Sequence, residues 1–148
     1  MKTLINKIAT SAAGLDTLPL RVGTGVIFAA HGAQKLFGWF GGYGLEGTAG
    51  WMTSIGLEPG LLMASMAGGA EFIGGLLLIV GLLVRPAALM LAVTMVVAIV
   101  TVHLPNGLFL ANNGYEFGLA LLAVSIGLVL RGAGSLSVDS VLQARLAS

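Results

Sequence analysis

Long hydrophobic runs alternate along the chain with short breaks that are polar or rich in glycine. The four runs cover about residues 18–37, 61–84, 86–104 and 114–130. Each has about the length of 17 to 25 apolar residues that lets a helix cross a bilayer. The pattern therefore predicts an all-α integral membrane protein, a four-helix transmembrane bundle that occupies residues 1–148 as a single domain.

The breaks between the runs carry residues that end helices. Arg85-Pro86 predicts a tight turn between the second and third runs, and Pro105-Asn106-Gly107 ends the third. The longest break, residues 38–60, is rich in glycine and in aromatic side chains, which are typical of the membrane–water interface. We expect it to form an external loop with a short interfacial helix over Thr48–Ile55.

Composition supports this class and excludes several others. Of the 148 residues, 57% are hydrophobic and only 9% are charged, against about a quarter in soluble domains. The net charge of +1 gives no reason to expect nucleic acid as a partner. The chain has no cysteine, so it holds no disulfide, thiolate metal site or thiol redox centre of its own.

Basic residues are distributed unevenly between the two sides of the predicted membrane. Lysine and arginine gather in segments that face the cytoplasm. One side has only Lys35, whereas the other has Lys2, Lys7, Arg21, Arg85, Arg131 and Arg145. With an even number of spans, both termini are then predicted to be cytoplasmic. Residues 1–17 are expected to lie along the membrane surface rather than form a cleaved signal peptide, because the first long apolar run begins only near Leu18 and carries charges.

Polar side chains of the predicted spans lie at similar depths. At about 1.5 Å per residue, Lys35 lies about 21 Å from Arg21, and Glu71 lies about 21 Å from Arg85. By the same rise, Glu116 lies about 22 Å from Arg131. Three further side chains lie within about one turn of this level: Gln34, His31 and His103. An ionisable side chain inside a bilayer is costly unless it is paired or faces the protein interior. We therefore expect one polar chamber that opens toward the outside.

Two carboxyl groups beside one lysine would leave a net negative charge in a low dielectric, so mobile protons are expected in this chamber. We assign proton-handling, catalytic roles to Glu71, Glu116, Lys35 and His31. Ligand contacts are expected from Gln34, His103, Tyr115 and Trp39. No metal site is predicted, because the Lys35 ammonium at the level of the carboxylates disfavours a bound cation.

Each of these side chains also has a purely structural interpretation. Lys35 could form an ion pair that only holds the bundle together, or it could extend to the interface. Trp39 and Tyr115 could be interfacial anchors, and His103 lies beside the helix break at Pro105, where water could reach it. A scaffold without chemistry is therefore an open alternative.

The second half of the chain is similar to the first. Gly69-Ala70-Glu71-Phe72 and Gly114-Tyr115-Glu116-Phe117 each precede a leucine-rich run that ends in arginine. This similarity predicts a duplicated helical hairpin whose copies are related by a twofold axis along the membrane normal. Small residues at four-residue spacing predict close packing of the first span against a neighbour, and such faces also allow a homo-oligomer; they are Gly25, Ala29 and Ala33.

A set of short motifs spreads over about residues 20–140. They are His31-Gly32-x-Gln34-Lys35-Leu36-Phe37-Gly38, Gly41-Gly42-x-Gly44, Ala70-Glu71-x-x-Gly74-Gly75, Gly81-Leu82-x-x-Arg85-x-Ala87-Ala88, His103 followed by Gly107-x-Phe109, Gly114-x-Glu116, and Gly132-Ala133-Gly134-Ser135-Leu136-Ser137-Val138-Asp139. In combination they resemble the DoxX family of small bacterial membrane proteins, although Val84-Arg85-Pro86 departs from the family's usual threonine-arginine turn. The resemblance implies a multi-pass protein of the bacterial cytoplasmic (inner) membrane, related to the membrane subunits of thiosulfate:quinone oxidoreductases.

The chamber and the resemblance together favour the membrane subunit of a redox system. Quinone reduction takes up electrons and protons, and the chamber offers hydrogen-bond donors and acids for both the ligand and its protons. The chain carries no intrinsic cofactor, so the electrons would come from a redox partner protein. A proton-linked transporter or binding protein for a small polar solute is the second candidate, and the scaffold is the third.

Overall fold

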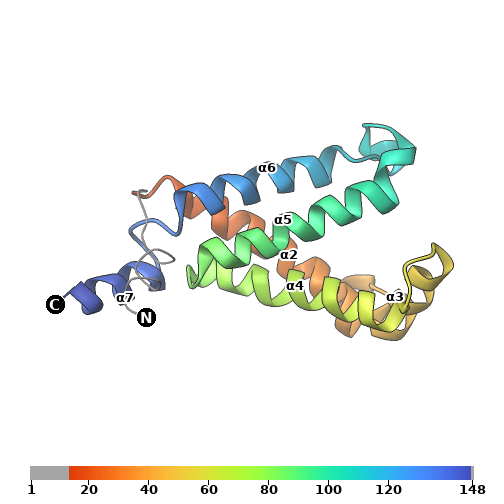
Figure 1. The fold of residues 1–148 in the computed structure, drawn as a ribbon, viewed down its shortest axis with the longest axis horizontal. Helices are drawn as coiled ribbons and strands as arrows, with labels where there is room; N and C mark the ends of the chain where they lie inside the picture. Colours follow the sequence, from red (N-terminus) through yellow and green to blue (C-terminus); the bar gives the residue numbers. More distant parts are fainter. Residues whose placement is uncertain (1–13, 148) are drawn as a thin grey trace.

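The computed structural model describes residues 14–147, and all regular secondary structure in that range is helical (Figure 1). The predicted all-α class is therefore confirmed for the part of the chain that the structure describes. Of the predicted surface segment, residues 1–13 lie outside this range. The four long helices are α2 (Thr17–Phe37), α4 (Gly60–Val80), α5 (Val84–Ala98) and α6 (Glu116–Arg131).

Shorter helical segments fill the connections. The long break contains a 3₁₀ turn, η1 (Trp39–Gly41), and the helix α3 (Gly44–Ser54), which is longer than the interfacial helix expected there. After α5 the chain continues through a π-helical turn, η2 (Ile99–His103), and a 3₁₀ turn, η3 (Leu104–Asn106). A further 3₁₀ turn, η4 (Leu110–Asn112), precedes α6, and α7 (Val138–Ala147) follows it.

Within residues 14–147, two helices are long and apolar enough to cross a membrane. They are α4, with 21 residues, and the continuous helix Val84–Asn106, with 23. By contrast, α6 has 16 residues, about 24 Å at 1.5 Å per residue, which is less than the hydrocarbon thickness of about 30 Å. The long helix α2 contains two basic side chains, Arg21 and Lys35.

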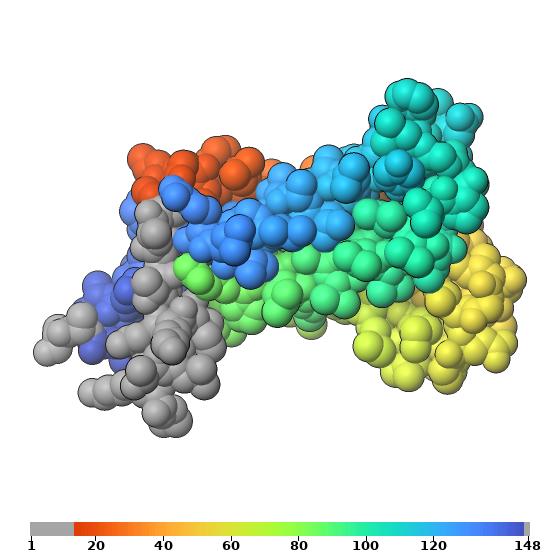
Figure 2. Space-filling view, turned by 45° about the horizontal axis from the view of Figure 1, so that its top comes forward, coloured from red at the N-terminus to blue at the C-terminus, as the bar shows by residue number. Residues whose placement is uncertain are grey.

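The long helices form a ring in which each packs against two neighbours. α2 lies against α4, α4 against α5, α5 against α6, and α6 against α2. The contact of α2 with α4 is the most extensive and that of α2 with α6 is the smallest. The start of α2 and the helix α7 lie at one end of the bundle, and α3 lies at the other (Figure 1). At that other end, the loop after α5 and the region of α3 stand apart (Figure 2).

Glycine brings the backbones of α2 and α4 together. A Cβ on Gly32 would lie 2.3 Å from the Phe72 nitrogen, and one on Gly75 would lie 2.5 Å from the Ala29 nitrogen. A Cβ on Gly25 would lie 2.8 Å from the Gly75 oxygen. These distances leave no space for a side chain, so the predicted close packing of the small-residue face of α2 is confirmed, with α4 as its neighbour.

Arg21 is buried at the end of the bundle where α2 begins, with 2% of its surface exposed. Its guanidinium donates to four carbonyl oxygens: Ala133 at 3.0 Å, Leu78 at 3.1 Å, Ile79 at 2.7 Å, and Leu136. The sequence marked Arg21 only as an indicator of the cytoplasmic side. The structure gives it a second role, because it satisfies carbonyls at the end of α4 and in the segment before α7.

Asp139 stabilises the same end through the start of α5. Its two carboxylate oxygens accept hydrogen bonds from the backbone nitrogens of Leu83 at 2.8 Å and Val84 at 3.0 Å. A helix N-terminus leaves amide groups without intrahelical acceptors, and a carboxylate there also interacts favourably with the helix dipole. Nearby, Arg131 forms an exposed ion pair with Asp16 at 2.6 Å and lowers the pKa of that carboxyl.

We predict that Gly32→Ala lowers the free energy of unfolding by about 1–3 kcal/mol, because the added methyl group forces the α2 and α4 backbones apart. The matched control is Gly23→Ala on the same helix, where a Cβ meets nothing within 4 Å. That variant should be neutral or slightly stabilising, because alanine has the higher helix propensity. Thermal unfolding in detergent measures both, and equal effects would contradict the packing argument.

Replacing Arg21 by methionine should lower the free energy of unfolding by about 3 kcal/mol or more, because buried carbonyl oxygens lose their donor. The comparison is Arg131→Gln at the same end, which breaks an exposed ion pair with little net effect on stability. Denaturant titration of the purified variants measures the difference. A loss in Arg21→Met no larger than that in Arg131→Gln would contradict the structural role of Arg21.

Candidate functional site

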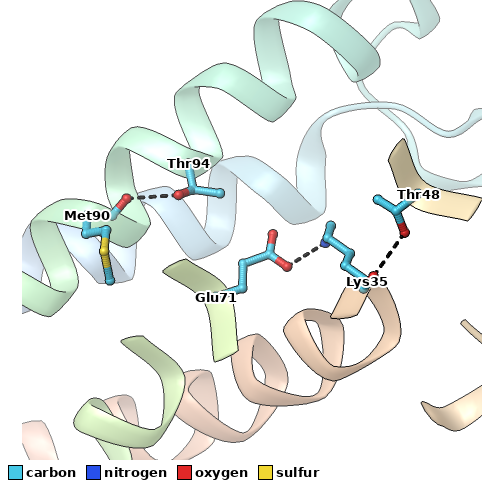
Figure 3. Close-up of polar contacts among 5 residues, drawn as sticks. All are labelled: Lys35, Thr48, Glu71, Met90 and Thr94. Carbon is cyan, nitrogen blue, oxygen red and sulfur yellow. Dashed lines mark hydrogen bonds and ion pairs between the residues drawn. The ribbon is translucent and has the colours of Figure 1, made fainter. Parts of the chain in front are cut away.

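The centre of the candidate site is an ion pair between α2 and α4. Lys35 Nζ lies 2.5 Å from Glu71 Oε2, and only 4% of the Glu71 side chain is exposed, against 26% for Lys35 (Figure 3). A Cβ on Gly68 would lie 3.2 Å from Lys35 Cβ, so glycine at this position lets the start of the lysine side chain pass close to α4. The Lys35 side chain therefore turns into the bundle and does not extend to the interface.

The buried carboxylate of Glu71 has unused hydrogen-bonding capacity. Oε2 accepts from Lys35, whereas no hydrogen bond to Oε1 is present among residues 14–147. On the facing helix α5, the hydroxyl of Thr94 donates to the Met90 carbonyl at 3.0 Å, so this hydrogen is used within α5 and not for Glu71 (Figure 3). An ionised carboxylate can accept several hydrogen bonds. Glu71 can therefore accept a further hydrogen bond, or a proton, from a bound molecule.

A cavity of about 500 Å³ lies beside Lys35 at the loop end of the bundle. It is lined by Gln34, Lys35, Gly41, Gly42, Tyr43, Gly47, Thr48 and Trp51. Two hydrogen bonds join the segments that line the cavity to α2. Thr48 Oγ1 of α3 donates to the Lys35 carbonyl at 3.3 Å, and Gln34 Nε2 of α2 donates to the Phe40 carbonyl of η1 at 3.2 Å. A Cβ on Gly42 would lie 2.4 Å from the backbone carbonyl oxygen of Gln34, so only glycine lets the loop fold this closely onto α2.

His31 lies on the side of α2 that faces α6. Its ring is tilted by 49° against that of Phe117, with 6.2 Å between the ring centroids. It is exposed, it precedes Lys35 by one turn of α2, and its neighbour Gly32 lies against Phe72, which follows Glu71. The structure thus brings His31, Lys35 and Glu71 into one neighbourhood, as the sequence predicted.

The Glu116 side chain has a different partner from the one expected. It is exposed at the start of α6, and its Oε1 accepts a hydrogen bond from the Leu110 nitrogen at 2.6 Å. The predicted common level agrees with the contacts of α2: Gly32 lies against Phe72, which follows Glu71, and His31 lies against Phe117, which follows Glu116. The described contacts do not bring the two carboxylates together.

The break after Val80 has a local cause in Gly81. Gly81 has φ of 73°, the left-handed conformation that commonly follows the last residue of a helix. Its nitrogen donates to the Leu77 carbonyl at 2.9 Å, which closes the last turn. Arg85 consequently belongs to the first turn of α5 rather than to α4.

The remaining predicted ligand contacts belong to the outer loops. His103 Nδ1 donates to the Asn113 carbonyl at 2.9 Å, and the Tyr115 nitrogen donates to the Gly107 carbonyl at 3.0 Å. Trp39 is 55% exposed, and its ring centroid lies 5.1 Å from that of Phe37. It lines an apolar groove of about 230 Å³ that is separate from the Lys35 cavity. In residues 14–147, no group of three or more histidine, aspartate or glutamate side chains is placed to hold a metal ion.

Sequence reasoning missed several residues that shape the site and its support. Thr48 lines the cavity and bonds the Lys35 carbonyl, but the sequence placed it only within an interfacial helix. Asp139 belongs to one of the quoted motifs, although nothing in its spacing indicates that it caps α5. Both roles depend on contacts between segments far apart in the chain.

Comparison with known proteins adds three relatives. The DoxX family model matches residues 17–104, a range that contains both Lys35 and Glu71 and ends before α6. The chain is 40% identical over 125 residues to "Putative oxidoreductase CatD" of Bacillus subtilis, covering 84% of this chain and 85% of that protein. No solved structure matches it significantly.

Two proteins of Haemophilus influenzae, both described as uncharacterized, are also similar. One is 32% identical over 128 residues, covering 82% of this chain and 86% of the relative. The other is 34% identical over 87 residues, covering 59% and 58%. The family model and the extent of these alignments agree with the motifs of α2 and α4, and the chain belongs to the DoxX family.

Proposed function

We propose that this chain is the membrane subunit of a redox system in the bacterial cytoplasmic membrane. In this proposal α2, α4, α5 and α6 all cross the bilayer and both termini are cytoplasmic. Two of these helices are long and apolar enough to do so, and the start of α2 lies at the same end of the bundle as α7. The basic side chains Arg21, Arg85 and Arg131 gather toward that end, which agrees with a cytoplasmic location.

The ligand site of this subunit is the Lys35–Glu71 pair, and its ligand is a quinone or a similar small amphipathic molecule. The observation that carries the proposal is a buried carboxylate, paired to a lysine that also lines a cavity. A quinone takes up protons as well as electrons when it is reduced. Lys35 can donate a hydrogen bond to a carbonyl oxygen, and Glu71 can pass a proton to or from that oxygen.

The electrons come from a partner protein. The chain has no cysteine, so a thiol relay within it is excluded. One relative carries the word oxidoreductase in its name, which supports the redox class for this family. The role of this chain is then to bind and orient the ligand, to keep water from the buried carboxylate, and to move protons.

A short-chain quinone analogue should stabilise the purified protein. At a concentration of 100 Kd, binding to the folded state adds about 2.7 kcal/mol to the free energy of unfolding. Glu71→Gln should abolish this protection, whereas Glu116→Gln should retain it, because Glu116 bonds Leu110 in the outer loop. Thermal unfolding with and without the analogue measures both. Equal protection of wild-type protein and Glu71→Gln would contradict the site.

Proteoliposomes separate this function from the second candidate. Uptake of a small polar solute that is driven by a proton gradient, in a protein that no quinone analogue stabilises, would favour the proton-linked transporter.

The ion pair itself should show strong coupling in a double-mutant cycle. Lys35→Met should lower the free energy of unfolding by about 3–5 kcal/mol, because it leaves the buried Glu71 carboxylate unpaired, and Glu71→Gln should lower it less, because Lys35 is partly exposed. The double variant should lose much less than the sum, because neither partner then remains. Denaturant titration measures the four proteins, and additive losses would contradict a direct interaction. A double variant that keeps the quinone protection would favour the scaffold interpretation of the pair.

A further inference from the structure

The ring of long helices is not equally tight on all sides. Backbones of α2 and α4 nearly touch at Gly32 and Gly75. Between α6 and η2, which continues α5, a Cβ on Gly118 would lie 3.1 Å from the Ile99 side chain. The contact of α2 with α6 is the smallest of the four. We call this side the α2–α6 seam. It is the place where the least packing has to be displaced to reach the inside of the bundle.

Two rings meet across the α2–α6 seam. His31 from α2 and Phe117 from α6 lie with their centroids 6.2 Å apart. Both can be reached from outside the bundle, since His31 is exposed and Phe117 is 38% exposed. At this level the seam is covered by two side chains from different helices.

His31 lacks a hydrogen-bond partner among residues 14–147, although it lies on a proposed membrane-spanning helix. An imidazole that faces hydrocarbon without a partner is costly, so such residues usually face polar groups or a pathway. A molecule with a polar headgroup that enters the seam would supply that partner.

The α2–α6 seam lies close to the buried ion pair. His31 precedes Lys35 by one helical turn of α2, and the next residue, Gly32, lies against Phe72, which follows Glu71. The Glu71 carboxylate points away from α4, into the space along which α5 and α6 run (Figure 3). The cavity beside α3 reaches Lys35 from the loop end instead. The cavity gives the pair one approach, from the loop end, and the α2–α6 seam lies on a different side of it.

We propose that the ligand of the Lys35–Glu71 pair is a lipid-dissolved amphipathic molecule that enters from the bilayer through the α2–α6 seam, past His31 and Phe117. This inference rests on the proposed membrane placement and ligand site. It adds the route and therefore the ligand class, because a lateral entrance within the hydrocarbon region selects molecules that partition into lipid. A polar solute would have to use the cavity at the loop end.

Carbodiimides of different polarity test the route, because they modify carboxyl groups and one can be chosen to dissolve in lipid. The full-length protein in liposomes is treated with dicyclohexylcarbodiimide or with a water-soluble carbodiimide, and mass spectrometry quantifies the adduct on Glu71. Phe117→Ala and His31→Ala should each raise the initial rate with the lipid-soluble reagent severalfold and leave the rate with the water-soluble one unchanged. The matched control is Phe37→Ala, which removes a ring from α2 that packs on Phe72 rather than on α6.

A reversible closure of the seam provides the second measurement. Because the chain has no cysteine, a His31→Cys/Phe117→Cys protein can be compared in its oxidised and reduced forms without other thiols. Cross-linking the seam, with a short bismaleimide in a parallel sample, should lower the lipid-soluble labelling of Glu71 severalfold. The matched pair Ile99→Cys/Gly118→Cys joins η2, the continuation of α5, to α6 and should leave the labelling unchanged.

Three outcomes would overturn the lateral route. They are no lipid-soluble labelling of Glu71 even in Phe117→Ala, equal acceleration of both reagents, and labelling that is unaffected by a completed cross-link at the seam. The measurement reports access and not quinone binding, so it separates the two proposals. Quinone protection with labelling insensitive to the seam would remove only the route, and seam-dependent labelling without quinone protection would remove only the quinone.

Discussion

The close approach of α2 to α4 is the contact on which the candidate site depends. Gly32 and Gly75 let the two backbones meet at distances that no larger residue allows, and Gly68 does the same for the start of the Lys35 side chain. In a lipid environment, close packing of this kind replaces the hydrophobic effect as the force between helices. The same contact places an ammonium group within reach of a carboxylate that would otherwise be buried alone. The ion pair is thus a consequence of glycine packing, and it adds specificity to the relative positions of the helices.

The buried charged side chains at the two ends of the bundle differ in how fully they are hydrogen-bonded. At the end where α2 begins, backbone groups satisfy both Arg21 and Asp139. Arg21 joins the segment before α7 to the end of α4, and Asp139 joins the first turn of α7 to the start of α5. Toward the loop end, Lys35 and Glu71 are bonded to each other, and each can form further hydrogen bonds. A saturated network stabilises a structure, whereas an unsaturated buried pair beside a cavity is typical of a site that binds something.

The internal similarity of the two halves does not extend to their carboxylates. Glu71 is buried in the middle of α4, and Glu116 is exposed at the start of α6, where it holds the preceding loop. The similar motifs therefore have different surroundings, and only the first half carries the ion pair. The ring of helices is asymmetric as well, because α2 packs far more extensively on α4 than on α6. The α2–α6 seam is where His31 and Phe117 meet.

Much of the architecture follows from the sequence alone. The hydrophobic runs and the low fraction of charged residues determined the helical membrane class, and the spacing of Gly25 and Ala29 indicated a closely packed face. These features are local, because helix formation and apolarity depend on residues within a few turns of each other. The proximity of His31 to Lys35 could be predicted for the same reason, since both lie on one helix.

Only the tertiary structure decided which carboxylate pairs with Lys35, what Arg21 binds, and which sides of the bundle are tight. Glu71 and Glu116 are similar in their sequence surroundings, but Glu71 is buried and pairs with Lys35, whereas Glu116 is exposed and accepts a hydrogen bond from the Leu110 nitrogen. Hydrogen bonds such as those of Arg21 to Ala133 and of Asp139 to Val84 join residues far apart in the chain. Their partners are set by how the helices pack and where they end, which the local pattern of a sequence does not encode.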